Sequence, residues 1–111
     1  PDEIVYPWTV TGNEGSITNG SLQGMGSLEI SVAVTNKRNE SQKYLMITAA
    51  YQNDSLLWAK PMPATIEPGE KGTLRTTDIV VQNIPGFEIR AFLITGFNET
   101  QIKCDMLRLT Q

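Results

Sequence analysis

The feature that most constrains the fold is a nine-residue run, 27–35, in which apolar and polar side chains alternate. Its regularly spaced apolar members are Leu28, Ile30, Val32 and Val34. Successive side chains of an extended strand point to opposite sides, so this alternation predicts a strand with one face in the core and one near solvent. No stretch of ten or more residues has sustained helical periodicity. The sequence therefore predicts an all-β protein.

Other runs of the chain also predict short strands, separated by residues typical of turns. The predicted strands are 6–10, 27–35, 43–51, 56–60, 73–81, 87–94 and 102–109, with a further short strand within 12–26. Turn signals about every 8–12 residues favour a sandwich or a barrel. Hairpins without intervening helices favour antiparallel pairing. A chain of 111 residues fits a single domain spanning 1–111.

One predicted strand, 43–51, is apolar on both faces, as expected of a central strand whose outer side something covers. We assign to the inner face Leu45, Ile47, Ala49 and Tyr51. We assign to the outer face Tyr44, Met46 and Thr48.

Charge and hydropathy argue against two classes of partner. The net charge is −3, the pI is about 4.8, and the nine basic residues are scattered, whereas nucleic-acid binding usually needs a concentrated basic face. No apolar run approaches the roughly 20 residues of a membrane span. We therefore expect neither nucleic-acid binding nor membrane insertion. The chain begins Pro1-Asp2-Glu3 without a leader pattern, and we expect a mature or excised segment of a longer protein.

Catalytic chemistry has little support in the composition. The chain has no histidine, which removes histidine-based nucleophile pairs, general bases and metal ligands. Its acidic residues are spread over turns and outward strand positions, so solvation explains them better than a hydrolytic carboxylate pair. The lone Cys104 lies in a strand pattern, and we interpret it as a buried, inert thiol. We predict no enzyme, no catalytic residues and no cofactor.

Two Asn-acid pairs, Asn53-Asp54 and Asn98-Glu99, have oxygen ligands that suit calcium, but no calcium-loop motif surrounds them. Turn formation is the better interpretation, and we predict no metal site. Asn-x-Ser/Thr triplets begin at Asn19, Asn39, Asn53 and Asn98. They indicate exposed turns, and in a eukaryotic secreted protein they would be glycan acceptors.

The aromatic residues are the candidate ligand platform. Trp58, Tyr44 and Trp8 are the residues that we single out, with Phe97 as a further ring. Exposed rings of this kind stack on sugars. The alternative is that Trp58 fills the core between two sheets, with its neighbour Leu57 pointing the other way.

Three segments carry a family resemblance. They are Ile47–Asp54, Ile66-Glu67-Pro68-Gly69 and Ile89-Arg90-Ala91-Phe92-Leu93. Together, Tyr44–Asp105 resembles the β-sandwich modules of secreted, multi-domain bacterial surface and carbohydrate-active proteins. The family often has a tryptophan after the Phe-Leu pair, where this chain has Ile94-Thr95. The paired cysteines of antibody-type domains are also missing.

This resemblance implies an immunoglobulin-like or fibronectin-type fold, and we predict an antiparallel immunoglobulin-like β-sandwich of about seven or eight strands. It also implies an accessory role outside the cell. We expect a non-catalytic spacer or protein-contact module of a secreted or cell-surface bacterial protein. Its partners would be other domains of the parent protein or a surface protein. The alternative is a carbohydrate-binding module that uses the aromatic platform.

Overall fold

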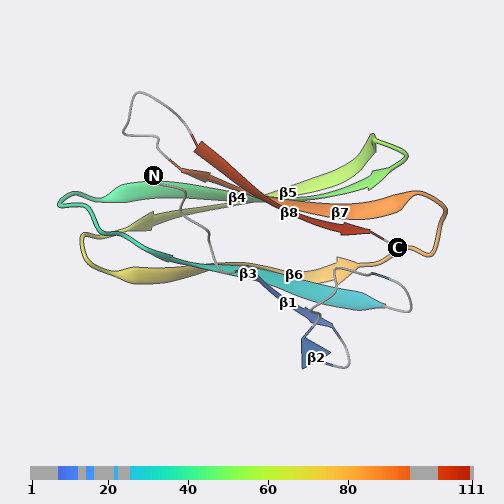
Figure 1. Ribbon diagram of the computed structural model, residues 1–111, viewed down its shortest axis with the longest axis horizontal. Coiled ribbons are helices and arrows are strands. Elements are labelled where there is room, and N and C mark those ends of the chain that lie inside the picture. The colour runs from blue at the N-terminus through green and yellow to red at the C-terminus, as the bar shows by residue number, and fades with distance from the viewer. Residues whose placement is uncertain (1–7, 13–14, 17–21, 23–25, 96–102, 111) are drawn as a thin grey trace.

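The computed structural model describes residues 8–12, 15–16, 22, 26–95 and 103–110. Two four-stranded antiparallel sheets lie face to face, one above the other in Figure 1. The predicted all-β sandwich is therefore confirmed. The strands are β1 (Trp8–Gly12), β2 (Gly15–Ser16), β3 (Ser27–Thr35), β4 (Gln42–Gln52), β5 (Ser55–Ile66), β6 (Lys71–Val80), β7 (Phe87–Thr95) and β8 (Lys103–Thr110).

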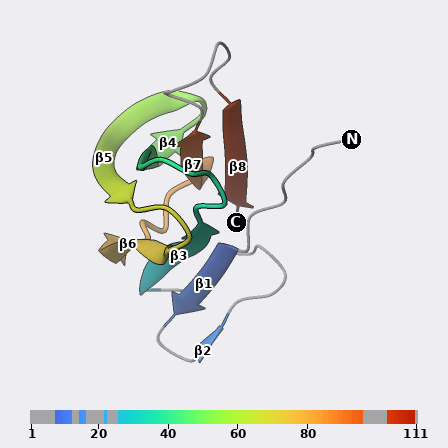
Figure 2. The ribbon, with the colours of Figure 1, turned by 90° about the vertical axis from the view of Figure 1, so that its left-hand side faces the viewer.

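The first sheet has the strand order β2-β1-β3-β6, and the second has the order β5-β4-β7-β8. Every pairing within them is antiparallel. Figure 2 shows how strongly β5 curves as it passes from the second sheet towards the first. The described part of the chain contains no helix with the length and hydropathy that a membrane crossing requires.

The first sheet follows the alternation that the sequence predicts. In β3, Leu28, Ile30, Val32 and Val34 are all buried, and the residues between them are partly exposed. Their partners Ile79, Thr76 and Leu74 in β6, opposite Leu28, Ile30 and Val32, are buried as well. One apolar face therefore packs inward from this sheet, and the polar residues of β3 face outward.

The second sheet reverses the predicted faces of its central strand. In β4 the inner face is formed by Tyr44, Met46, Thr48 and Ala50, all of them buried. Leu45, Ile47 and Tyr51, which we expected inside, lie on the outer side and are partly exposed, and Ala49 lies there although it is buried. Our assignment was wrong because both alternate sets of this strand are apolar.

The partner strand β7 decides between the two sets. Met46 lies opposite Leu93, and Thr48 lies opposite Ala91. Directly opposed residues of an antiparallel pair point to the same side of the sheet. Since Leu93 and Ala91 are fully buried, Met46 and Thr48 must face the core with them. Thr48 satisfies its hydroxyl there by donating a 3.0 Å hydrogen bond to Oγ1 of Thr76 on the opposite sheet.

The hairpin between β4 and β5 confirms the predicted turn at 52–55. Asn53 and Asp54 both have positive φ, 50° and 67°, as a two-residue type I′ hairpin turn requires. Asn tolerates this conformation because its short polar side chain bonds locally. The backbone N–H of Asn53 also donates to the carbonyl of Gly86, 3.1 Å away. Asn53 and Asn39 are exposed, as predicted, whereas Asn19 and Asn98 lie outside the described residues.

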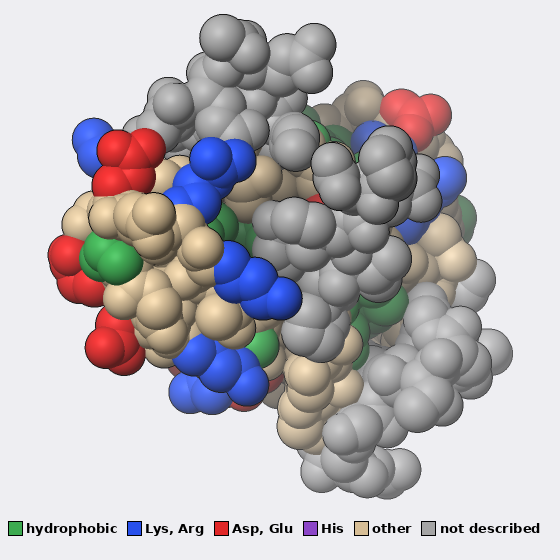
Figure 3. All heavy atoms as spheres, turned by 60° about the vertical axis from the view of Figure 1, so that its left-hand side comes forward, with side chains coloured by type: hydrophobic (Ala, Val, Ile, Leu, Met, Phe, Trp, Pro, Cys, Tyr) green, Lys and Arg blue, Asp and Glu red, His purple; other side chains and the backbone are tan. Residues whose placement is uncertain are grey.

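A buried asparagine holds the loops at the opposite end of the sandwich. Asn36 is fully buried, and its Nδ2 donates to the carbonyls of Glu40 and Ile66 at 2.9 and 2.8 Å. Its backbone carbonyl accepts from Gly69, so it joins the β3–β4 loop to the β5–β6 turn. Figure 3 shows this end, where Lys and Arg side chains lie among acidic ones with small hydrophobic areas between them.

Candidate functional site

The three rings of the predicted ligand platform do not share an exposed surface. Tyr44 is only 8% exposed and belongs to the core, so its predicted outward position was wrong. It lies on the inner face of β4 for the reason given above. Trp8 is on β1 of the first sheet, and Trp58 is on β5 at the edge of the second. Phe97 lies outside the described residues.

Both tryptophans are partly buried and pack against the core. Trp58 lies opposite the buried Ala50, so its ring lies on the inner side, while Leu57 is 41% exposed. This arrangement matches the interpretation of Trp58 as a packing residue. The ammonium of Lys60 lies 5.3 Å from the centre of its ring, within the range of a cation–π contact.

Trp8 connects the two sheets. Its indole Nε1 donates a 2.7 Å hydrogen bond to a carboxylate oxygen of Asp105 on β8. The ring therefore spans from the first sheet to the edge of the second, 97 residues away in sequence. A hydrogen bond to a carboxylate is stronger than one between neutral groups, so the ring has a structural partner.

Cys104 is exposed, not buried as we predicted. It lies opposite Ile94 on the outer side of the sheet, and β8 alternates so that Leu107 and Leu109 turn inward. Our prediction failed because alternation alone does not say which set faces the core. Partial desolvation and, secondarily, the nearby charge of Asp105 raise the pKa of the thiol, which disfavours the nucleophilic thiolate.

The outer side of the second sheet carries an extended apolar surface, which we call the outer apolar face. Cross-strand register places Ile47 opposite Pro61 on β5 and Phe92 on β7, and Phe92 opposite Met106 on β8. In the neighbouring row, Leu45 lies opposite Pro63 and Ile94, and Ile94 lies opposite Cys104. The members of the face are Leu45, Ile47, Ala59, Pro61, Pro63, Phe92, Ile94, Cys104 and Met106. All of them are exposed or partly exposed, and Met106 reaches 51%.

A charged cluster borders this face. Glu88 on β7 accepts hydrogen bonds from Arg90, at 2.9 and 3.1 Å, and from Arg108 on β8, at 2.6 and 3.2 Å. Arg90 also reaches Asp54 in the β4–β5 turn at 2.8 Å. Its guanidinium lies 4.1 Å from the centre of the Tyr51 ring. Arg90 and Arg108 each make two hydrogen bonds to the same carboxylate, and such paired bonds fix the orientation of both guanidinium groups.

The hydrogen bonds from Arg90 and then Arg108 lower the pKa of Glu88 to about 2, against a smaller opposing effect of burial. Bonding to Glu88 and Asp54 in turn raises the pKa of Arg90. The carboxylate is therefore ionised and fully engaged at neutral pH. Such a group is poorly suited to general acid–base catalysis, which needs a pKa near the working pH.

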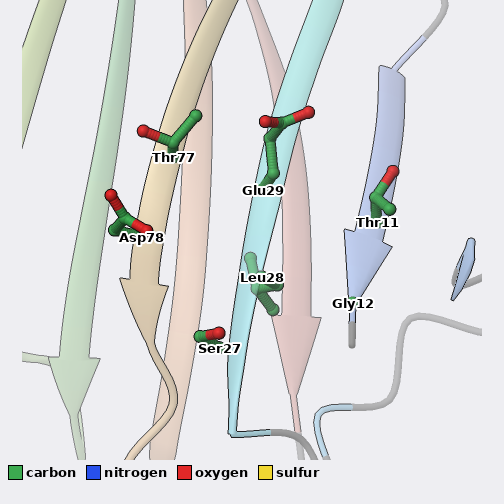
Figure 4. A pocket seen from close by; sticks show the side chains of 7 residues that line it. All are labelled: Thr11, Gly12, Ser27, Leu28, Glu29, Thr77 and Asp78. Atoms are coloured by element: carbon green, nitrogen blue, oxygen red, sulfur yellow. The ribbon is translucent and has the colours of Figure 1, made fainter. Parts of the chain in front are cut away.

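A hollow of about 250 Å³ lies on the outer side of the first sheet. Its lining comes from β1, β3 and β6, as Figure 4 shows. The register shifts here between Leu28 and Ile30, and Asp78 has a positive φ of 54°, so the hollow follows from an irregularity in the ladder. Glu29 is paired with Arg75 at 3.4 Å. Within the described ranges, no three acidic or cysteine side chains are grouped as a metal site requires.

Of these features, the sequence indicated the outer apolar face only indirectly, through the double-sided apolar character of 43–51. The charged cluster was missed. Its signal was the alternation of apolar and charged residues at 87–90, which was used only to predict a strand. A scan against models of protein families and a search of curated proteins found no match to this chain.

Proposed function

We propose that this domain is a non-catalytic accessory module of a secreted or cell-surface bacterial protein, and that it makes a protein contact through the outer apolar face. The observation that supports this is the outer apolar face itself. A sheet face that contacts water is normally polar, so that apolar and polar residues alternate along its strands. On β4 and β7 the outward residues Leu45, Ile47, Phe92 and Ile94 are all large and apolar.

The size of the face favours a tethered partner. Four strands about 4.8 Å apart and two to three rows of residues give roughly 300 Å². Functional apolar patches on single domains reach about 300–600 Å². A stable complex between separate proteins needs about 800 Å² per partner, whereas contacts between domains of one chain start near 600 Å² in total. Another domain of the parent protein is therefore the best-fitting partner.

The strand order supports the immunoglobulin-like or fibronectin-type part of the proposal. In an immunoglobulin-type sandwich, strands A, B and E share one sheet and C, F and G share the other. Here β1, β3 and β6 take the first set of positions, and β4, β7 and β8 take the second. The remaining long strand, β5, pairs with β4. The resemblance of Tyr44–Asp105 to secreted bacterial modules supports the extracellular setting.

Dye binding tests the contact face. A solvatochromic hydrophobic dye should gain fluorescence with the native domain, and Phe92→Lys should abolish most of that gain. The matched control is Thr73→Lys on the outer side of the first sheet, which should leave dye binding unchanged. Equal dye binding by wild type and Phe92→Lys would count against the proposal.

Titration with soluble polysaccharides separates the proposal from the carbohydrate-binding alternative. Tryptophan fluorescence reports on Trp8 and Trp58, both of which pack against the core. We expect no saturable shift. A saturable shift that Trp58→Ala removes would favour the carbohydrate-binding module instead.

A further inference from the structure

The four edges of the two sheets are not equally protected against pairing with another strand. Exposed edges present unpaired N–H and C=O groups, and proteins block them with prolines, charges, bulges or very short strands. β5 has Pro61 and Pro63, which cannot donate to a ladder. β2 has only two residues. β6 has an irregular register and the positive φ of Asp78.

β8 has no proline, no bulge and a full length of eight residues, so its charges, Lys103, Asp105 and Arg108, are its only such devices, and Arg108 is bonded to Glu88 of β7 within the same sheet. It pairs with β7 in unbroken register from Lys103 to Thr110. Figure 2 shows it at the margin of the second sheet. In the part of the chain that the structure describes, β7 is the only strand paired with it. Its inward charge, Asp105, is held by Trp8 and does not project from the edge.

The hydrogen bond of Thr110, the last residue of β8, shows which residues of this strand direct their backbone groups away from β7. The carbonyl of Thr110 accepts from the backbone N–H of Leu22 at 2.8 Å, so it points away from β7. In an antiparallel ladder, alternate residues direct their N–H and C=O groups to opposite sides. Arg108, Met106 and Cys104 therefore present their backbone groups to the free edge.

We propose that β8 pairs with β8 of a second copy of this chain about a two-fold axis, which joins the two second sheets into one eight-stranded sheet. An antiparallel pair places residues of the same phase opposite each other. Met106 then lies opposite Met106 of the second copy, and Cys104 lies opposite Arg108. This register pairs the free backbone groups of Cys104, Met106 and Arg108 on each copy. The carbonyl of Thr110 keeps its hydrogen bond with Leu22.

Charge selects this register over its neighbours. Sliding the strands by two residues in one direction places Asp105 opposite Asp105 of the second copy, and like charges in direct opposition are destabilising. Sliding them in the other direction requires the Thr110 carbonyl that Leu22 already occupies. In the proposed register Asp105 lies opposite Leu107, and no like charges face each other.

The occupant of the edge is a second copy because the strand is complementary to itself in length, phase and charge. The interface is isologous, as two-fold dimers require. The inference goes beyond the proposed function, since the pairing uses the edge of the sheet and leaves most of the outer apolar face open.

Sedimentation of the whole 111-residue chain tests the pairing. We expect reversible dimerisation, and we expect Met106→Pro to weaken it by at least about tenfold. The N–H that this variant removes points away from β7, so the monomer should still fold. Met106→Lys is a second variant that keeps the N–H and sets two charges against each other. Val80→Lys, an exposed position on β6, is the matched control and should leave the dimer unchanged.

Cross-linking tests the register. With Cys104→Ser as background, Met106→Cys should form an intermolecular disulfide, because opposed α-carbons in such a pair lie about 5.5 Å apart. Leu107→Cys in the same background points inward and should not. A strictly monomeric chain, a dimer unaffected by Met106→Pro and Met106→Lys, or a dimer lost instead in Ile47→Lys would overturn the proposal.

Discussion

The two outer faces of this sandwich differ in chemistry although both belong to antiparallel four-stranded sheets. The first sheet turns Thr9, Thr11, Glu29, Ser31 and Arg75 to the outside. The second turns out the outer apolar face, bordered by the charged cluster around Glu88. Water solvates a polar outer face favourably. Covering an apolar face lowers the free energy, because it removes apolar surface from water. This difference is the basis on which we propose that the second sheet makes the contact.

The sharpest test of this comparison substitutes, one at a time, two neighbouring residues of β7 whose side chains lie on opposite sides of the sheet. Leu93 is fully buried and Ile94 is partly exposed. Leu93→Ala should lower the free energy of unfolding by about 2–5 kcal/mol, because it leaves a cavity in the core. Ile94→Ala should lower it by less than about 1.5 kcal/mol. Urea unfolding measures both, and equal losses would mean that the outer side is packed like the core.

The charged cluster on the second sheet predicts a pH dependence of stability. The pKa of Glu88 falls from 4.5 to about 2 on folding, so its contribution to stability is fully present above about pH 4.5 and is lost as the pH falls through 2. Arg108 is half exposed, and solvent screening limits the contribution to about 1–2 kcal/mol.

Glu88→Gln should therefore destabilise the domain by about that amount at pH 7, and the difference from wild type should shrink as the pH falls towards 2. Glu29→Gln is the matched control, since its ion pair with Arg75 is exposed on both sides, and it should change stability by less than about 0.5 kcal/mol. Denaturant unfolding at a series of pH values measures both. A constant difference between Glu88→Gln and wild type across this range would contradict the assigned pKa.

The link between the sheets should give the smallest effect. Trp8→Phe keeps most of the packing but removes the hydrogen bond to Asp105, and it should cost about 1 kcal/mol in unfolding free energy. Asp105→Asn retains an acceptor and should cost less. If Trp8→Phe were neutral, the bond would not contribute to holding β1 against β8.

The same comparison explains what was predictable from sequence. β3 alternates between apolar and polar residues, so the inner positions of Leu28, Ile30, Val32 and Val34 were predicted correctly. The middle of β4 is apolar on both faces, and these faces are distinguished only by its partners in β7, about 35 to 49 residues away. Sequence periodicity contains no information on that pairing, so Tyr44 and Met46 were assigned to the wrong side.

Cys104 illustrates the same limit at an edge. Its strand alternates in the expected way, but the set that turns inward is Leu107 and Leu109, and Cys104 and Met106 are exposed. The membership of the charged cluster was also missed, because the alternation at 87–90 does not show which charges meet. The cluster joins Asp54, Glu88, Arg90 and Arg108, which are brought together only by the register of β7 with β4 and β8 and by the turn at Asn53-Asp54.

The most direct test of the outer apolar face is methyl NMR of the isolated domain with a soluble paramagnetic probe. Signals of residues that contact solvent are broadened by the probe. Ile47 and Ile94 on the outer side should broaden strongly, and Ile30 and Ile89, which are fully buried, should be protected. Equal protection of Ile47, Ile94, Ile30 and Ile89 would show that this face is covered within the chain itself, and it would contradict its assignment as a contact surface.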